Sequence, residues 1–316
     1  MKAVVQKGYG GLGNLSLRDI AVPEAGRGEV AVRVEACGAN ASDWEFVTGR
    51  PGYARLAGAF RPRPRVLGSD VVGVVEAVGE GVALQVGQRV VADTFGSFGG
   101  FASICVAKAD RFVPVAADMD PTVVACLPQS GTIVLDAFSD RVRAGMRVLV
   151  NGAGGGSGPM AIQYAKSLGA HVTGVDNVGK LSVMAAAGAD EVRDYEAWDF
   201  ATSGETWDVI LDMYGTRRPR ELVPALADGG RYMMVGGPML VLIHVALAGL
   251  RKRRDGKSIG VLAVNQGPDR LAELMGLARD GVISPVIGER VQIEGAMQAL
   301  ARMGAGATPG KLVVVA

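Results

Sequence analysis

Cysteine and histidine are scarce in this 316-residue chain, which has three cysteines and two histidines. An odd number of widely spaced cysteines, Cys37, Cys105 and Cys126, argues against a disulfide framework and against a CxxC metal clip. His171 and His244 have no cysteine, histidine or carboxylate neighbour at the spacing of metal ligands. We therefore expect both histidines to be structural residues, and we expect no metal site.

The chain also lacks an excess of charge of one sign and a long apolar run. Its 33 basic and 32 acidic residues leave a net charge of +1, which gives no attraction for nucleic acid or an anionic membrane. The longest apolar stretch, residues 239–250, is too short to span a bilayer, and the RKRR run at 251–254 is expected to be a solvated helix end. The N-terminal MKAVVQKGYG has no secretory signal. These features predict a cytoplasmic protein that binds neither nucleic acid nor membranes.

Hydrophobic residues make up 49% of the chain, enough for a substantial core in one large domain or two. Up to about residue 118, short valine-rich runs alternate with Gly, Pro and Asp, which predicts an all-β region. The expected strands there are 2–5, 29–36, 70–78, 89–92 and 101–106.

From about Pro121 the pattern changes to alternating helices and strands, which is typical of a doubly wound parallel sheet. We expect the last strand, KLVVVA, to return to the N-terminal β region, so that the alternating region is an insertion. Helices are expected at 121–137, 139–143, 159–168, 268–280 and 294–302, and strands at 147–150, 171–175, 191–193, 208–211 and 231–235.

The glycine-rich segment 148–176 is the most informative part of the sequence. A short apolar strand leads into the turn Gly152–Gly158, which lacks bulky side chains and therefore lets the backbone approach a diphosphate. A helix and a second strand follow, and Asp176 lies at the tip of that strand, 18 residues beyond Gly158. This order of strand, Ala153-x-Gly155-x-x-Gly158 turn, helix, strand and acid predicts a dinucleotide-binding βαβ unit.

Over its whole length the chain resembles the zinc-free quinone oxidoreductase branch of the medium-chain dehydrogenase/reductase superfamily. The resemblance implies a doubly wound parallel Rossmann sheet inserted in a mostly β GroES-like domain, with domains at 1–120, 121–255 and 256–316. The segments that carry it, besides the glycine-rich one, are GEVAVRVEACGANASDW (28–44), VLGSDVVGVVEAVGEGV (66–82), GGFASICV (99–106), LPQSGTIVLDA (127–137), GADEVRDY (188–195), the pair Asp208 and Asp212, GGRYMMVGG (229–237) and GKLVVV (310–315).

The departures from zinc-dependent alcohol dehydrogenases are informative too. Where those enzymes carry a cysteine ligand this chain has Asn40, and where they carry a His-Glu pair it has Ser69 and Asp70. The four closely spaced cysteines of their structural zinc lobe are also missing from the sequence. Without zinc no strong Lewis acid stabilises an alkoxide, so simple alcohol oxidation is disfavoured. The resemblance then implies hydride transfer from NAD(P)H to a quinone or to a C=C bond conjugated with a carbonyl group. A non-catalytic nucleotide-binding protein and a biosynthetic enzyme with a non-redox step remain alternatives.

Such a reaction needs hydrogen-bond donors for the developing enolate oxygen. The candidates are the side chains of Asn40, Tyr53, Ser69 and Thr132, of which Asn40 matches a family asparagine beside the nicotinamide and the substrate. A loop-stabilising role for Asn40 and a surface position for Tyr53 are the alternatives. Trp44 and Phe98 either line an apolar slot or serve packing alone.

Asp176 favours NADH, because a carboxylate at this strand tip accepts hydrogen bonds from the ribose hydroxyls and repels a 2′-phosphate. Lys180 and Tyr195 are candidates to offset that repulsion. The resemblance further implies a homodimer formed through the nucleotide-binding domain and a small-molecule substrate. The residues expected to bind the coenzyme are Asn40, Thr132, Ala153, Gly155, Gly156, Ser157, Gly158, Asp176, Lys180, Tyr195, Asp212, Gly236 and Gly237.

Overall fold

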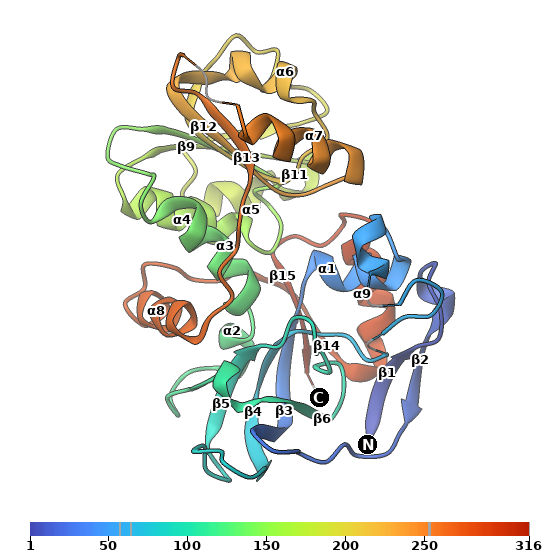
Figure 1. Cartoon of the computed structure of the whole chain (residues 1–316). Coiled ribbons are helices and arrows are strands. Elements are labelled where there is room, and N and C mark those ends of the chain that lie inside the picture. The colour runs from blue at the N-terminus through green and yellow to red at the C-terminus, as the bar shows by residue number, and fades with distance from the viewer. Residues whose placement is uncertain (57, 64, 252–253, 316) are drawn as a thin grey trace. The chain divides into compact units, whose positions relative to one another are not determined.

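The computed structural model describes the chain except for residues 57, 64, 252, 253 and 316, so part of the RKRR run lies outside the described residues. The chain divides into two compact units (Figure 1). Unit 1 comprises Met1–Thr132, Gln266–Arg279 and Ile287–Ala316, and unit 2 comprises Ile133–Asn265 and Asp280–Val286. The predicted insertion of one unit within the other is thereby confirmed, whereas the domain boundaries at 120 and 255 stay a prediction.

Unit 1 is built on a mainly antiparallel seven-stranded sheet in the order β14-β15-β3-β4-β5-β7, with β6 paired to β3. The last strand, β15, pairs antiparallel with β3, so the C-terminal segment does return to the N-terminal β region. A separate hairpin is formed by β1 and β2. The strands are β1 (Lys2–Gln6), β2 (Leu15–Asp19), β3 (Glu29–Ala39), β4 (Asp70–Val78), β5 (Arg89–Asp93), β6 (Ile104–Lys108), β7 (Phe112–Pro114), β14 (Ile287–Gln292) and β15 (Lys311–Val315).

Helices cover this sheet and close its core. Helix α1 packs against α9, and the indole of Trp44 lies so close to Gly304 that a Cβ there would be 2.2 Å from its Nε1. Phe98 is 1% exposed and packs against the rings of Phe46 and Phe95, so it is a core residue. The helices outside unit 2 are α1 (Ala41–Thr48), α2 (Pro121–Val124), α8 (Pro268–Arg279) and α9 (Ala296–Gly304); α3 (Pro128–Phe138) begins in unit 1 and ends in unit 2.

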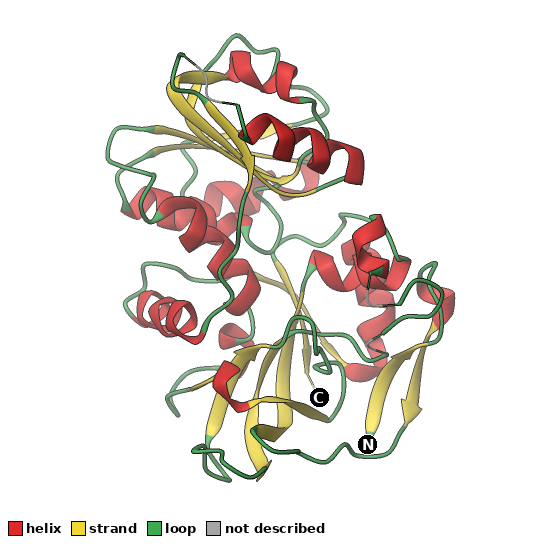
Figure 2. Cartoon of the chain, viewed as in Figure 1, coloured by secondary structure: helices red, strands yellow, loops and turns green. Residues whose placement is uncertain are grey.

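Unit 2 contains six parallel strands in the order β10-β9-β8-β11-β12-β13, with helices on both sides of the sheet (Figure 2). This confirms the predicted doubly wound sheet. The strand order reverses between β8 and β11, and such a switch point is where open α/β sheets bind ligands. The elements are β8 (Arg147–Asn151), β9 (His171–Asp176), β10 (Glu191–Asp194), β11 (Trp207–Tyr214), β12 (Leu226–Gly236), β13 (Ser258–Val261), α4 (Gly158–Ser167), α5 (Leu181–Ala186), α6 (Pro219–Leu222) and α7 (Met239–Gly249).

Two helix predictions are wrong in detail. The helix predicted over 121–137 is interrupted between α2 and α3, because the residue before Pro128 is disfavoured in a helix and the proline itself fits the first position of α3. The helix predicted at 139–143 is a set of turns that leads to Gly145, whose φ of 82° suits a turn. Within the described residues, no helix has the length and apolar character needed to cross a bilayer.

Candidate coenzyme and substrate sites

The glycine-rich turn connects β8 to α4, and its glycines differ in how closely they are packed: a Cβ on Gly154 would lie 2.4 Å from the Lys180 side chain. A Cβ on Gly158 would lie 2.0 Å from the carbonyl oxygen of Ala153, so a side chain there would force the turn open. A Cβ on Gly155 would approach nothing closer than the carbonyl oxygen of Gly152, at 3.5 Å. Ser157 is the N-cap of α4 and makes no side-chain cap hydrogen bond. The turn is therefore closed at Gly154 and Gly158, whereas Gly155 has room beside it, and an open glycine next to the amide end of a helix is suited to receive an anion.

Asp176, at the end of β9, is buried and accepts several hydrogen bonds within unit 2. Its Oδ2 accepts from the backbone N–H of Gly154 at 2.9 Å, and its Oδ1 accepts from the backbone N–H of Asn177 at 2.8 Å. The ammonium of Lys180 lies 3.4 Å from Oδ1, and the Lys180 side chain is only 9% exposed. The predicted strand-tip acid is therefore held against the glycine-rich turn and is charge-compensated by Lys180.

Tyr195 follows the neighbouring strand β10, and its backbone N–H donates to the Asp176 carbonyl oxygen at 3.1 Å. Its side chain is half exposed. Three of the residues predicted to bind the adenosine end of a coenzyme, Asp176, Lys180 and Tyr195, thus lie together at the carboxyl ends of β9 and β10.

Asp212 lies at the carboxyl end of β11 and joins three neighbouring strands. Its Oδ1 accepts from the side-chain amide of Asn151 at 2.8 Å, and its Oδ2 accepts from the hydroxyl of Tyr232 at 2.7 Å. Burial raises the pKa of the Asp212 carboxyl, and these hydrogen bonds oppose the rise. The Asp212 side chain therefore links three adjacent strands, β8, β11 and β12.

Gly236 and Gly237 lie at the same edge, at the end of β12. The N–H of Gly215 donates to the Gly236 carbonyl oxygen at 2.9 Å. A Cβ on Gly237, whose φ is 149°, would lie 2.3 Å from the Gly215 carbonyl oxygen. These glycines bring the carboxyl ends of β11 and β12 into close contact.

Unit 1 contains a buried polar network around Asn40. The ammonium of Lys311 donates to Oδ1 of Asn40 and, at 3.2 Å, to Oδ2 of Asp70. The Asn40 amide donates to Oγ of Ser69 at 3.3 Å, and the Ser69 hydroxyl faces Oδ1 of Asp70 at 3.5 Å. Burial raises the pKa of the Asp70 carboxyl, and the Lys311 ammonium is the strongest influence against it. The structure thus brings together two predicted donors, Asn40 and Ser69, and adds Lys311.

Asn40 is also the residue from which α1 begins. Its backbone N–H donates to Oδ2 of Asp43 at 2.8 Å, while Oδ1 of Asp43 accepts from the N–H of Gly68 at 2.9 Å. Asp43 is fully buried, and burial raises its pKa to about 7 against these two hydrogen bonds. Asp43 therefore ties the start of α1 to the segment that carries Ser69.

The hydroxyls of the other two predicted donors, Tyr53 and Thr132, donate to groups outside this network. The Tyr53 hydroxyl, in the short turn that follows α1, donates to the carboxylate of Glu45 on α1. Burial raises the pKa of Glu45, and the hydrogen bond from Tyr53 opposes it. The Thr132 hydroxyl donates to the carbonyl oxygen of Pro128 at 2.7 Å, which is a bond within its own helix.

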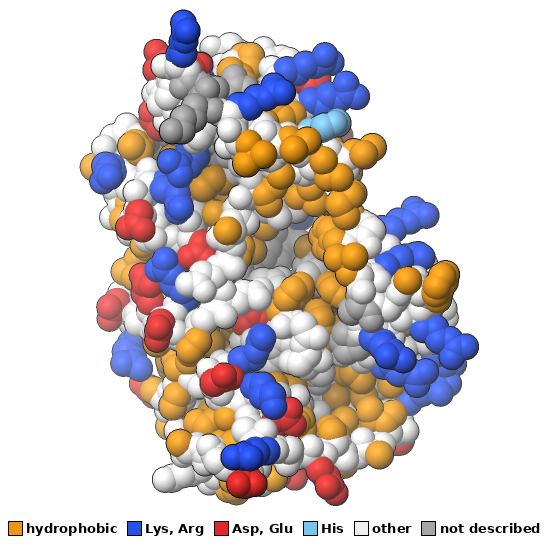
Figure 3. Space-filling view, in the orientation of Figure 1, with side chains coloured by type: hydrophobic (Ala, Val, Ile, Leu, Met, Phe, Trp, Pro, Cys, Tyr) orange, Lys and Arg blue, Asp and Glu red, His pale blue; other side chains and the backbone are white. Residues whose placement is uncertain are grey.

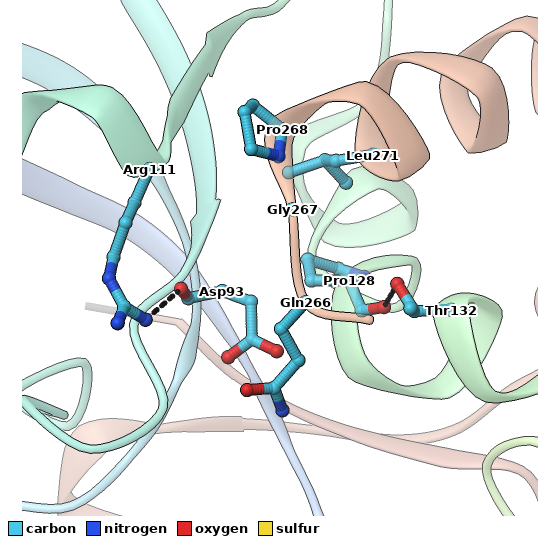
Figure 4. A pocket seen from close by; sticks show the side chains of 8 residues that line it. All are labelled: Asp93, Arg111, Pro128, Thr132, Gln266, Gly267, Pro268 and Leu271. Carbon is cyan, nitrogen blue, oxygen red and sulfur yellow. Dashed lines mark hydrogen bonds between the residues drawn. The ribbon is translucent and has the colours of Figure 1, made fainter. Parts of the chain in front are cut away.

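Thr132 does line a small cavity of unit 1 (Figure 4). The centre of a water molecule can move within about 20 Å³ of this cavity. The cavity therefore has room for one ordered water and is too small for a substrate. The carboxylate of Asp93 extends into the space beside Gln266, and its Oδ2 is buried without a hydrogen-bond partner among the described residues. Burial and the nearby Asp70 raise the pKa of Asp93 to about 7.

Lys311 is a site residue that was not predicted from the sequence, although the sequence carries a signal for it. Lys311 opens the strand KLVVV, and the rest of that strand is apolar, so a charged side chain there needs a buried counter-ion. Asp70, in the segment that resembles a zinc-ligand segment, is that counter-ion. Within the described ranges, no group of three or more His, Cys, Asp and Glu side chains could hold a metal ion.

Comparison with known proteins gives the family. Residues 26–117 match the alcohol dehydrogenase GroES-like domain, and residues 187–314 match the family described as zinc-binding dehydrogenase. The chain is 30% identical to the quinone oxidoreductase of Mus musculus over 95% of its length and 92% of that protein.

Two solved structures are similar over the whole chain. A quinone oxidoreductase from Coxiella burnetii shares the fold with a TM-score of 0.89 at 24% identity, covering 100% of this chain and 99% of that one. A mycobacterial protein solved in complex with NADPH has a TM-score of 0.81 at 27% identity, with 100% of both chains covered. With its glycine-rich turn, its inserted parallel sheet and these relatives, the chain belongs to the quinone oxidoreductase branch of the medium-chain dehydrogenase/reductase superfamily and is an NAD(P)H-dependent oxidoreductase.

Proposed function

We propose that this oxidoreductase works without zinc and transfers a hydride from NAD(P)H to a quinone or to a C=C bond conjugated with a carbonyl group. The observation that carries the proposal is the network around Asn40. The residues that take the place of zinc ligands, Asn40, Ser69 and Asp70, direct their polar atoms to one another and to the ammonium of Lys311. Their amide, hydroxyl and single carboxylate are a poor donor set for zinc, which prefers thiolates and imidazoles.

The chemistry follows from this donor set. When bound, the coenzyme supplies the hydride for the β-carbon of the acceptor. The displaced electron pair moves to the carbonyl oxygen, which becomes an enolate, and a proton from water completes the product. The Asn40 amide is suited to donate a hydrogen bond to that oxygen, and buried donors of this kind are worth more than donors in water.

For the coenzyme we propose a preference for NADH, supported by the carboxylate of Asp176 at the tip of β9. The NADPH bound to the mycobacterial relative argues for tolerance of the 2′-phosphate in this family. In this chain Lys180 compensates the charge of Asp176, so the preference is expected to be modest.

The test is coenzyme oxidation by the purified protein, followed against quinones, enones, enoyl esters and saturated alcohols with both coenzymes, before and after treatment with a chelator. We expect oxidation of NADH with enones or quinones and no loss after chelation. Activity confined to alcohols, or abolished by chelation and restored by zinc, would contradict the proposal. Tight coenzyme binding without turnover of any acceptor would favour a non-catalytic or non-redox role.

We also propose a homodimer formed through unit 2. Hydrophobic side chains gather over α7 (Figure 3), and Leu240, Ile243, Leu247 and Leu250 there are between 45% and 81% exposed. These residues recur at helical spacing along α7 and its C-cap, and a second copy is the partner that would remove such a stripe from water. Mass measurement in solution tests this: we expect a dimer for the wild type and a monomer for Leu240→Asp/Leu247→Asp.

A further inference from the structure

Lys311 occupies an unusual position for a lysine. Its side chain is 1% exposed, and its stem passes Gly38 so closely that a Cβ there would lie 3.2 Å from Cε. The ammonium group contacts Oδ1 of Asn40 and Oδ2 of Asp70. A fully buried ammonium is costly unless it is paired, so the surrounding residues are arranged to hold a positive charge at this point.

This contact decides which way the Asn40 side chain faces. An ammonium group has only donors, so the oxygen of the Asn40 amide must face Lys311 and the NH2 group must face away from it. A flipped amide would direct N–H toward N–H at Lys311, and the Ser69 hydroxyl would have to turn from Oδ1 of Asp70 to donate to the amide oxygen. One N–H of Asn40 donates to Oγ of Ser69 at 3.3 Å, and no acceptor for the other is recorded among the described residues.

The positive charge also changes the strength of the remaining donor. A hydrogen bond from an ammonium to the amide oxygen draws electron density from the amide nitrogen, and hydrogen bonds in a chain polarise one another. The second N–H of Asn40 is therefore a stronger donor to a developing oxyanion than an isolated amide would be.

We propose that Lys311 is a positioning residue that orients and polarises the Asn40 amide, so that its second N–H stabilises the enolate oxygen of the substrate. The proposal rests on the proposed function. In it, a fixed ammonium acts through one amide at the place where zinc-dependent relatives carry metal ligands. Asp70 holds the Lys311 ammonium in position, and Ser69 accepts a hydrogen bond from the first N–H of the Asn40 amide.

Stability alone is a weak reason for such a pair. Replacing a buried ion pair by uncharged side chains of similar size is often neutral or stabilising, whereas removing one partner leaves a buried charge without compensation. Lys311→Met alone would leave Asp70 in that state. The informative variant is therefore Asp70→Asn/Lys311→Met, which removes both charges together.

The experiment compares the wild type, Asp70→Asn/Lys311→Met, Asn40→Ala and the triple variant, with kcat and KM for one enone and the dissociation constant for the coenzyme. The matched control is Glu35→Gln/Arg89→Met, which removes an ion pair of 2.8 Å elsewhere in unit 1. We expect the charge-free pair to fold, bind the coenzyme normally and lose kcat by about 10- to 100-fold with little change in KM. Asn40→Ala should cost a similar factor in the wild type and less than about threefold in the pair variant, since coupled residues are not additive.

Two results would overturn the inference while leaving the proposed function intact. One is a pair variant with kcat within about twofold of the wild type, and the other is an Asn40→Ala cost that is the same in both backgrounds. If the wild type itself reduces none of the acceptors, the proposed function fails and the inference fails with it. Circular dichroism and the melting temperature of each variant show whether a loss of activity comes from loss of folding or from loss of catalysis.

Discussion

Asp176 accepts a hydrogen bond from the backbone N–H of Gly154 at 2.9 Å, so the tip of β9 is tied to the turn that precedes α4. The carboxylate is thus part of the turn's own structure, and Lys180 at 3.4 Å is its counter-ion. Any effect of Asp176 on the choice between NADH and NADPH therefore depends on Lys180.

The first prediction concerns a variant that lacks the counter-ion Lys180. Lys180→Met keeps the apolar stem that packs against Gly154 but leaves Asp176 without a cation nearby. The uncompensated carboxylate should repel a 2′-phosphate, and we expect the ratio of NADPH to NADH dissociation constants to rise about tenfold, equivalent to about 1.4 kcal/mol. Lys166→Met, which removes an ammonium from Asp190 near the other end of α4, is the control and should leave the ratio unchanged. A shift toward NADPH in Lys180→Met would contradict the prediction.

The second prediction separates two glycines of the same turn. Gly158→Ala places a methyl group 2.0 Å from the Ala153 carbonyl oxygen, so we expect a markedly lower melting temperature and no measurable coenzyme binding. Gly155→Ala meets only ordinary contacts within the protein, so its melting temperature should stay within a few degrees of the wild type. Its coenzyme affinity should still fall about tenfold or more, because the methyl group would occupy the approach of the diphosphate. Calorimetric titration and thermal melts of both variants decide this; normal affinity in Gly155→Ala would place the diphosphate elsewhere.

The sequence predicted these features to different extents, for physical reasons. The glycine-rich turn and the strand-tip acid depend on local spacing, and a local pattern is enough to identify them. The partner of a buried charge is a different matter, because Lys311 and Asp70 are 241 positions apart and only the pairing of β15 beside β3 brings them together. The break between α2 and α3 was predictable from Pro128, but the apolar periodicity on both sides concealed it.

The third prediction concerns the hydrogen bond between Tyr232 and Asp212. Tyr232→Phe removes a hydroxyl that donates to a fully buried carboxylate at 2.7 Å, which leaves one carboxylate oxygen without its partner. We expect the free energy of unfolding, measured by urea denaturation, to fall by about 1–3 kcal/mol. Tyr214→Phe, at a tyrosine that is 57% exposed, serves as the comparison and should change stability by less than about 0.5 kcal/mol. Equal effects of the two changes would show that Asp212 is satisfied in another way.

The last prediction concerns the dependence of stability on pH. Asp93 has its pKa raised to about 7 in the folded chain, while the ordinary value is 3.8. Between these values the folded state retains a proton that the unfolded state has lost, so the free energy of unfolding falls as pH rises through this window, by about 1.4 kcal/mol per pH unit. Asp93→Asn keeps an oxygen that can accept from the N–H of Phe95 and cannot ionise, so its stability relative to the wild type should rise from pH 5 to pH 8. Some slope should remain, because Asp43 has a similarly raised pKa. Urea denaturation at pH 5, 6.5 and 8 measures it, and parallel curves for the two proteins would rule out an Asp93 that is neutral when buried.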